Sequence, residues 1–182
     1  MKSLKSLVMV IPMLLVAGLL GCSDTPPKSP DVTDTIRKSL DQAGYKDVSV
    51  SQDRDKGVVT LSGTVPADSD KAQAESIAKS AAAGQVVADQ IAVRPPGEES
   101  VAKTVASDLD KGIEKNLDAA LVQRKMDKGI SYDVKNGVVT LKGDVSSQGR
   151  RSSIAQIAKD VPNVTQVVNE LQVKAQKATS PN

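Results

Sequence analysis

Hydrophobic and polar residues alternate in one nine-residue segment that the chain contains twice. The segment is GVVTLSGTV at 57–65, and it returns 80 residues later as GVVTLKGDV at 137–145. With a period of two, one face of such a strand carries Val59, Leu61 and Val65, and the other carries Val58, Thr60 and Thr64. The pattern predicts a strand in a sheet that is covered on one side only, and the repeat predicts two similar folding units.

Around the first copy of this segment, the apolar spacing predicts the order helix, strand, strand, helix, strand. Ser29-Pro30 suits the start of a helix, whose apolar stripe is followed by Gly44 as the expected stop. A short strand at 48–50 and a polar turn at 53–57 precede the repeated segment. Asp68 or Ser69 opens a second helix, and the last strand runs over about 86–93.

This order predicts an α+β fold made of two tandem α-β-β-α-β domains. In each domain two helices cover one face of a three-stranded mixed sheet, because a hairpin makes the first strand pair antiparallel and a helical crossover makes the second parallel. The expected divisions are a signal peptide at 1–21, a lipidated cysteine and proline-rich tether at 22–30, domains at 31–93 and 101–173, a linker at 94–100, and a flexible tail at 174–182.

The second copy departs from the first mainly in its first helix. Apolar residues recur there every four positions, at Val101, Val105, Leu109, Ile113, Leu117 and Leu121. A repeat of four winds around a helix with 3.6 residues per turn, so one small sheet cannot cover all of it. Either the helix breaks near Ser107 or Gly112, or its surplus apolar surface packs on the other copy, a partner or lipid.

Basic residues flank the same helix. Lys111, Lys115, Arg124 and Lys125 are interspersed with acidic residues, which is typical of a solvated helix face. The alternative is that these four residues contact an anionic surface.

The remainder of the second copy follows the first. Alternating residues at 130–134 predict a strand, Asn136-Gly137 a turn, Ser147 a helix cap and 164–173 the last strand. The linker Arg94-Pro95-Pro96-Gly97 continues neither regular structure and is short. We therefore expect the copies to touch, or to be restricted in their relative motion.

The amino terminus has the features of a secretory signal. Two lysines precede an apolar run of about 14 residues, which is short for a membrane span and suits a signal-peptide core. The run ends in Leu19-Leu20-Gly21-Cys22, which resembles the lipobox of bacterial lipoproteins and implies that Cys22 is lipidated. An ordinary secretory signal with an incidental cysteine is the alternative. Ser23, where Asp would imply inner-membrane retention, implies the periplasmic face of the outer membrane.

The assembled pattern resembles the BON domain of bacterial envelope proteins. The resemblance rests on the repeated glycine-flanked strand, an alanine-rich helix with Ile77-Ala78-Lys79, and the strand VVNELQV at 167–173, and it covers about 31–93 and 105–173. It implies binding of anionic phospholipid through the first helix of the second domain, at 108–122, and a role in outer-membrane integrity. Gly57, Gly63, Gly137 and Gly143 match the domain signature, and we interpret them as turn and close-packing residues.

Composition and charge narrow the function further. Without Lys2 and Lys5 of the signal segment the charges balance, but residues 31–93 carry net charge −3 and residues 101–173 carry +2. The absence of histidine, of a phosphate-binding loop and of aromatic platforms argues against an enzyme, a metal or cofactor site, and a nucleic-acid partner. Two hypotheses remain: a module that contacts a phospholipid surface, and a protein-interaction or chaperone-like adaptor that docks through the 101–121 helix.

Overall fold

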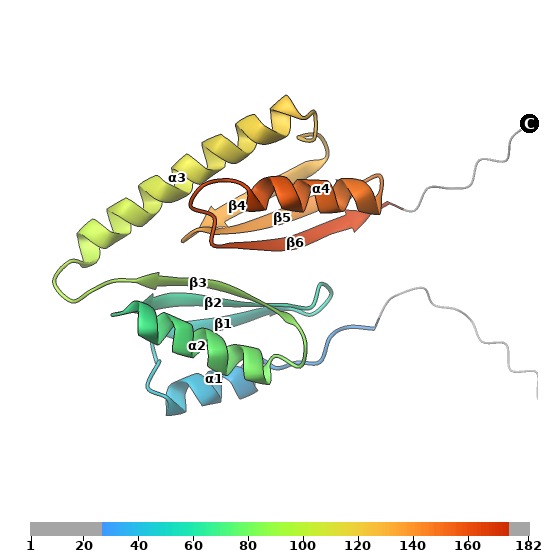
Figure 1. Cartoon of the computed structure of the whole chain (residues 1–182). Coiled ribbons are helices and arrows are strands. Elements are labelled where there is room, and N and C mark those ends of the chain that lie inside the picture. The colour runs from blue at the N-terminus through green and yellow to red at the C-terminus, as the bar shows by residue number, and fades with distance from the viewer. Residues whose placement is uncertain (1–26, 175–182) are drawn as a thin grey trace, which may run out of the picture.

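The computed structural model describes residues 27–174, which form two copies of one α-β-β-α-β plan (Figure 1). The predicted α+β fold class is thereby confirmed. The first copy contains α1 (Thr33–Gln42), β1 (Val48–Asp53), β2 (Val58–Val65), α2 (Asp68–Ala81) and β3 (Val86–Val93). The second contains α3 (Glu99–Gln123), β4 (Ile130–Lys135), β5 (Val138–Val145), α4 (Gln148–Lys159) and β6 (Gln166–Val173).

Each sheet has three strands, with the repeated segment in the middle. The orders are β1-β2-β3 and β4-β5-β6. In both sheets the first pair is antiparallel and the second parallel, as the hairpin and the helical crossover predicted. The register is the same in both copies, since Leu61 lies opposite Val50 and Asp89, and Leu141 lies opposite Tyr132 and Asn169.

The helices cover one face of each sheet and form its core. In the first copy, α1 and α2 bury Ile36, Leu40, Ala74 and Ala78 against Val59, Leu61 and Val65 of β2. In the second copy, α3 and α4 bury Ile113, Leu117, Leu121, Ile154 and Ile157 against the equivalent residues of β5. Aliphatic side chains alone therefore fill the fully buried positions of both cores.

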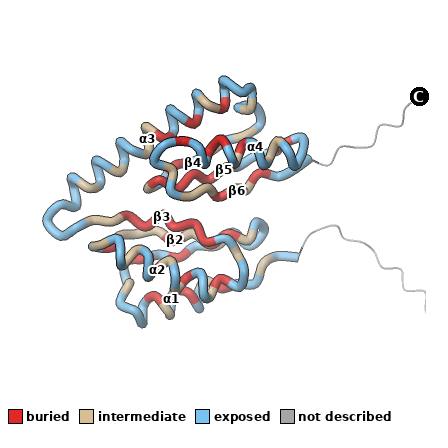
Figure 2. Tube along the Cα trace, in the orientation of Figure 1, coloured by how far each residue is buried: buried red, intermediate tan, exposed pale blue. Residues whose placement is uncertain are grey.

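The opposite faces of the two sheets cover each other. Val58, Ala88, Val138 and Val168 form a buried cluster between the sheets, and each is less than 9% exposed. Figure 2 shows buried positions along β2, β3, β5 and β6, where the copies meet. The expectation of a sheet covered on one side only was therefore wrong, whereas the expected contact between the copies is present.

The contact between the copies is reciprocal. Val58 and Ala88 lie 80 residues before Val138 and Val168, so the apolar cluster uses the same positions twice. Lys56 Nζ lies 2.8 Å from a carboxylate oxygen of Glu170, and the equivalent Asn136 amide donates to the Gln90 carbonyl oxygen at 2.8 Å. Such pairing of equivalent positions is the signature of a two-fold related interface.

Helix α3 is one continuous helix of 25 residues, so the break considered near Ser107 or Gly112 does not occur. Its second half packs on the second sheet through Ile113, Leu117 and Leu121. The first half extends beyond the length of α1 and crosses the end of β3 (Figure 1). The surplus apolar stripe therefore continues onto an extension that has no counterpart in the first copy.

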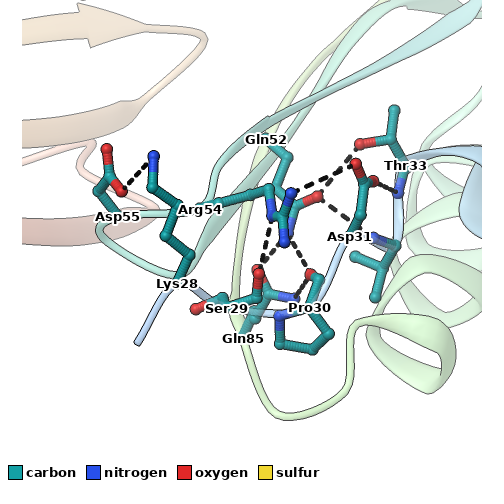
Figure 3. A network of polar contacts seen from close by, with 10 residues as sticks. Lys28, Ser29, Pro30, Asp31, Thr33, Gln52, Arg54, Asp55 and Gln85 are labelled. Carbon is teal, nitrogen blue, oxygen red and sulfur yellow. Dashed lines mark hydrogen bonds and ion pairs between the residues drawn. The ribbon is translucent and has the colours of Figure 1, made fainter. Parts of the chain in front are cut away.

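The chain enters the first copy through a polar clamp (Figure 3). Arg54 and Ser29 exchange hydrogen bonds of 2.8 and 2.9 Å, and the side-chain amides of Gln52 and Gln85 donate to the Pro30 carbonyl oxygen at 2.7 and 3.0 Å. Ser29 is not a helix cap, because α1 begins at Thr33 with Val32 at the cap position. Residues 28–30 are thus bound to the first copy. Of the tether predicted at 22–30, only residues 22–27 precede this clamp.

Four signature glycines occupy backbone conformations that other residues rarely adopt. Asn136 and Gly137 have φ of +49° and +78°, the pattern of a tight hairpin turn, and Gly57 has φ of +65°. Gly63 and Gly143 have φ of +116° and +117°. A Cβ at Gly143 would lie 2.5 Å from the Gly129 carbonyl oxygen, and one at Gly63 would meet the Asp47 carbonyl oxygen.

Replacement of Gly143 by alanine is expected to destabilise the second copy strongly. The new Cβ would collide with rigid backbone at a φ that L-residues avoid, so the free energy of unfolding should fall by about 2–4 kcal/mol. Urea unfolding followed by circular dichroism measures this change.

Gly112→Ala is the matched control, because Gly112 lies within α3 and a Cβ there meets no atom within 4 Å. Alanine stabilises a helix interior over glycine by up to about 1 kcal/mol, so this variant should gain stability. Equal effects of the two substitutions would contradict the close-packing role of Gly143.

Candidate functional site

The four basic residues proposed for an anionic surface all lie on or just beyond α3 and are exposed. Lys111 and Lys115 are four residues apart and therefore share one side of the helix. Arg124 and Lys125 follow the helix end, about 14 Å farther along the axis at 1.5 Å per residue. The structure places them as two pairs rather than one cluster. Lys111 Nζ contacts a carboxylate oxygen of Asp108 at 3.2 Å, and both side chains remain largely exposed.

The first half of α3 presents apolar side chains to solvent. Val101, Val105 and Leu109 are 62%, 53% and 47% exposed. They lie at intervals of four, so together they form a stripe along the helix. This stripe is not covered by either sheet.

One polar contact fixes α3 to the β4–β5 turn of its own copy, and another fixes β6 against the first copy. The Asp110 carboxylate accepts hydrogen bonds of 2.8 and 2.9 Å from the backbone N–H groups of Asn136 and Gly137. The Gln166 side chain donates to the Val87 carbonyl oxygen at 2.7 Å and accepts from the Asp89 N–H at 3.0 Å. Gln166 thereby occupies backbone groups of β3, which is an edge strand of its sheet.

Asp89 is a buried carboxyl group at this junction and is only 6% exposed. Burial raises the pKa of Asp89 above its ordinary value of 3.8, while a hydrogen bond from the Ile91 N–H and nearby Lys71 act in the opposite direction. The equivalent position in the second copy is Asn169, whose side-chain oxygen accepts the corresponding bond from Leu171 N–H at 3.2 Å. The second copy thus retains the hydrogen bond without an ionisable group.

Cys22 lies outside the described residues, as does the predicted tail beyond Lys174. Cys22 and Pro27 are five positions apart, a stretch that can span at most about 17 Å. The first and last described residues lie at the same end of the sheets, opposite the linker (Figure 1). A lipid on Cys22 would therefore hold this end of the first copy near the membrane.

Residues 27–174 contain neither a metal-binding cluster nor a membrane-spanning helix. No group of three or more acidic, histidine or cysteine side chains is arranged to hold a metal ion there. Within the same residues, no helix combines the length and apolarity needed to cross a bilayer.

Comparison with protein-family models shows to which family this chain belongs. The BON domain family model matches residues 29–95 and again 109–175. This chain belongs to the BON domain family. Each match contains one complete sheet with its two helices, except that the first half of α3 precedes the second BON domain.

The chain is also similar to individual proteins. The chain is 31% identical over 144 residues to osmotically-inducible protein Y of Escherichia coli K12, covering 79% of this chain and 71% of that protein. It is also 31% identical over 144 residues to an uncharacterised protein from the gshII 5′ region of Anaplasma centrale, covering 78% and 92%. Among solved structures, the C-terminal domain of CdsD from the type III secretion system of Chlamydia trachomatis matches with a TM-score of 0.34 at 14% identity, covering 82% of this chain and 100% of that domain.

Sequence reasoning missed the residues that join the two BON domains. One signal was present in β3, where VVADQIAV is almost continuously apolar rather than alternating. Such a run is typical of a strand buried on both faces. The partners Gln166 and Glu170 carried no comparable signal, because polar residues on a strand are ordinarily solvated.

Asp89→Asn is expected to stabilise the protein at pH 7 by up to about 1 kcal/mol. With a raised pKa in the folded state, the folded protein binds more protons than the unfolded chain between pH 3.8 and that pKa. The free energy of unfolding therefore falls as pH rises through this window, and the parent and variant should converge below it. Urea unfolding between pH 4 and 7 measures the difference.

The exposed Asp133→Asn variant serves as the control and should follow the parent at every pH. If the free energies of unfolding of Asp89→Asn and the parent differed by the same amount at pH 4 and at pH 7, Asp89 would not be the source of the pH dependence.

Proposed function

We propose that this protein is a non-catalytic envelope lipoprotein, held by a lipidated Cys22 at the periplasmic face of the outer membrane, where its BON domains contact phospholipid. Its contribution is to outer-membrane integrity or to tolerance of envelope stress. The observation that carries this proposal is the clamp at residues 28–30, because it fixes Ser29 within about 24 Å of the lipobox cysteine. An anchor there confines both domains to the membrane surface.

Charge favours the second BON domain for the phospholipid contact. Residues 101–173 carry net charge +2, whereas residues 31–93 carry −3. The pairs Lys111 with Lys115 and Arg124 with Lys125 are exposed on α3 and are available to anionic headgroups. The similarity to a protein named for osmotic induction supports a role under envelope stress.

The exposed apolar stripe supports a second candidate function. Val101, Val105 and Leu109 offer a helix face of the kind that docks on another protein. On this alternative the anchored chain is an interaction or chaperone-like adaptor. Failure of the protein to bind anionic vesicles would favour it over the phospholipid contact.

Lipidation predicts that Cys22→Ala abolishes fatty-acid incorporation. Cells fed an alkyne analogue of palmitate should label the parent chain and a Ser23→Ala control, and the parent should fractionate with the outer membrane. Incorporation of as much label by Cys22→Ala as by the parent would overturn the anchor.

Phospholipid contact predicts that residues 23–182, which retain every described element, sediment with vesicles containing phosphatidylglycerol. Each basic side chain at an anionic surface contributes about 1 kcal/mol, so removing a contacting pair should weaken binding about 10- to 30-fold. The variants are Lys111→Gln with Lys115→Gln, and Arg124→Gln with Lys125→Gln. Raising the salt from 0.1 to 1 M should weaken the parent in the same way.

Lys38→Gln with Lys46→Gln is the matched control, because it removes two exposed charges from the first BON domain. This pair should bind like the parent. If all three double variants bound equally, or if salt had no effect, headgroup attraction by the second domain would be refuted.

A further inference from the structure

We infer that a groove between the two BON domains binds an anionic amphiphile with one acyl chain, of which a long-chain carboxylate is the simplest form. The groove has a volume of about 600 Å³ and lies between the end of β3, the first half of α3 and the β4–β5 turn. This volume falls within the range of about 300–1,000 Å³ that small-molecule sites occupy. The site does not depend on the proposed membrane contact.

The walls of the groove suit an acyl chain. Ala92 of β3 faces it from one side, and Ala102, Ala106 and Leu109 of α3 from the other. The α3 residues belong to the helix extension that has no counterpart in the first copy, so this groove is formed once and not twice. Leu109 is also 47% exposed, which leaves apolar surface for a ligand to cover.

The charges of the groove suit an anionic head. Five basic and two acidic side chains line it. One of the acids, Asp110, already accepts the Asn136 and Gly137 N–H groups, so its charge is engaged. The remaining excess of positive charge favours a carboxylate or phosphate over a neutral head.

Arg94 is the residue we assign to that head. Its Nε atom is buried and has no hydrogen-bond partner among residues 27–174. Because protein atoms enclose Nε, an anionic head would pair with the outer part of the guanidinium group, which lines the groove and forms no ion pair among residues 27–174.

Comparison with the second BON domain shows that the missing partner is specific to this position. The residue equivalent to Arg94 is Lys174, and the backbone N–H groups of both make the same bond, to Val65 and Val145 at 2.8 and 2.9 Å. Lys174 Nζ is paired with the Asp144 carboxylate at 3.4 Å. The position equivalent to Asp144 is Thr64, so the first domain lacks the acid where the groove opens.

The proposed occupant is a separate molecule rather than the chain's own anchor. The groove lies at the linker end of β3, whereas the clamp at Ser29 lies at the opposite end of that strand, about 26 Å away at 3.3 Å per residue. A chain of residues 23–182 lacks Cys22 altogether, so any binding it shows reports a free ligand.

The test is a titration of isotope-labelled residues 23–182 with dodecanoate, below the concentration at which it forms micelles, followed by amide chemical shifts. We expect saturable binding, with the shifts concentrated at 91–94 and 102–113. Each buried methylene contributes about a fourfold gain in affinity, so decanoate, which is two methylenes shorter, should bind about 15-fold more weakly. Shifts spread over the whole surface, or no dependence on chain length, would overturn the proposal.

Two variants test the assigned residues. Arg94→Gln should weaken dodecanoate binding at least tenfold, whereas Arg37→Gln on α1, outside the groove, should bind like the parent. Ala106→Phe should fill the groove and block dodecanoate while leaving vesicle sedimentation unchanged, which separates this site from the phospholipid contact. Parent-like dodecanoate affinity in both Arg94→Gln and Ala106→Phe would refute the site.

Discussion

The packing of two sheet faces against each other is the constraint on which the rest of the structure depends. A three-stranded sheet with helices on one side leaves its other side open, and units of this size bury only about 60% of their unfolded surface. Here Val58 and Ala88 of one BON domain meet Val138 and Val168 of the other. The duplication thus supplies the cover that each small sheet lacks, in the manner of a dimer within one chain.

The two BON domains are equivalent in their cores but not at their junction. Lys56 and Glu170 form an ion pair at one end, while the equivalent Asn136 and Gln90 form a neutral hydrogen bond at the other. Asp89 and Asn169 make the same backbone contact, but only the first can ionise. Lys174 pairs with the Asp144 carboxylate, whereas the first domain has Thr64 at the equivalent position, so Arg94 has no such acidic partner. The junction is therefore symmetric in which positions meet but asymmetric in the charges that they carry.

The two ends of the molecule differ in the segments that they carry. At one end the clamp around Ser29 and Pro30 receives the chain, and the last strand of the second domain finishes nearby (Figures 1 and 3). At the other end the linker leads into the extension of α3, with exposed Val101 and Val105 and the groove beneath it. An anchor at the first end would leave the second free to meet ligands or partners.

The sequence by itself determined the local structure, because alternation, helical spacing and turn glycines act over a few residues and occurred twice. The order of elements, the mixed sheets and the cap at Ser147 followed from those patterns. Only the tertiary structure decided that α3 runs unbroken, that Ser29 is bound by Arg54, and that the face of each sheet opposite its helices is buried. Contacts of this kind join residues far apart in the sequence, from 25 positions for Ser29 and Arg54 to 114 for Lys56 and Glu170, and no local pattern encodes them.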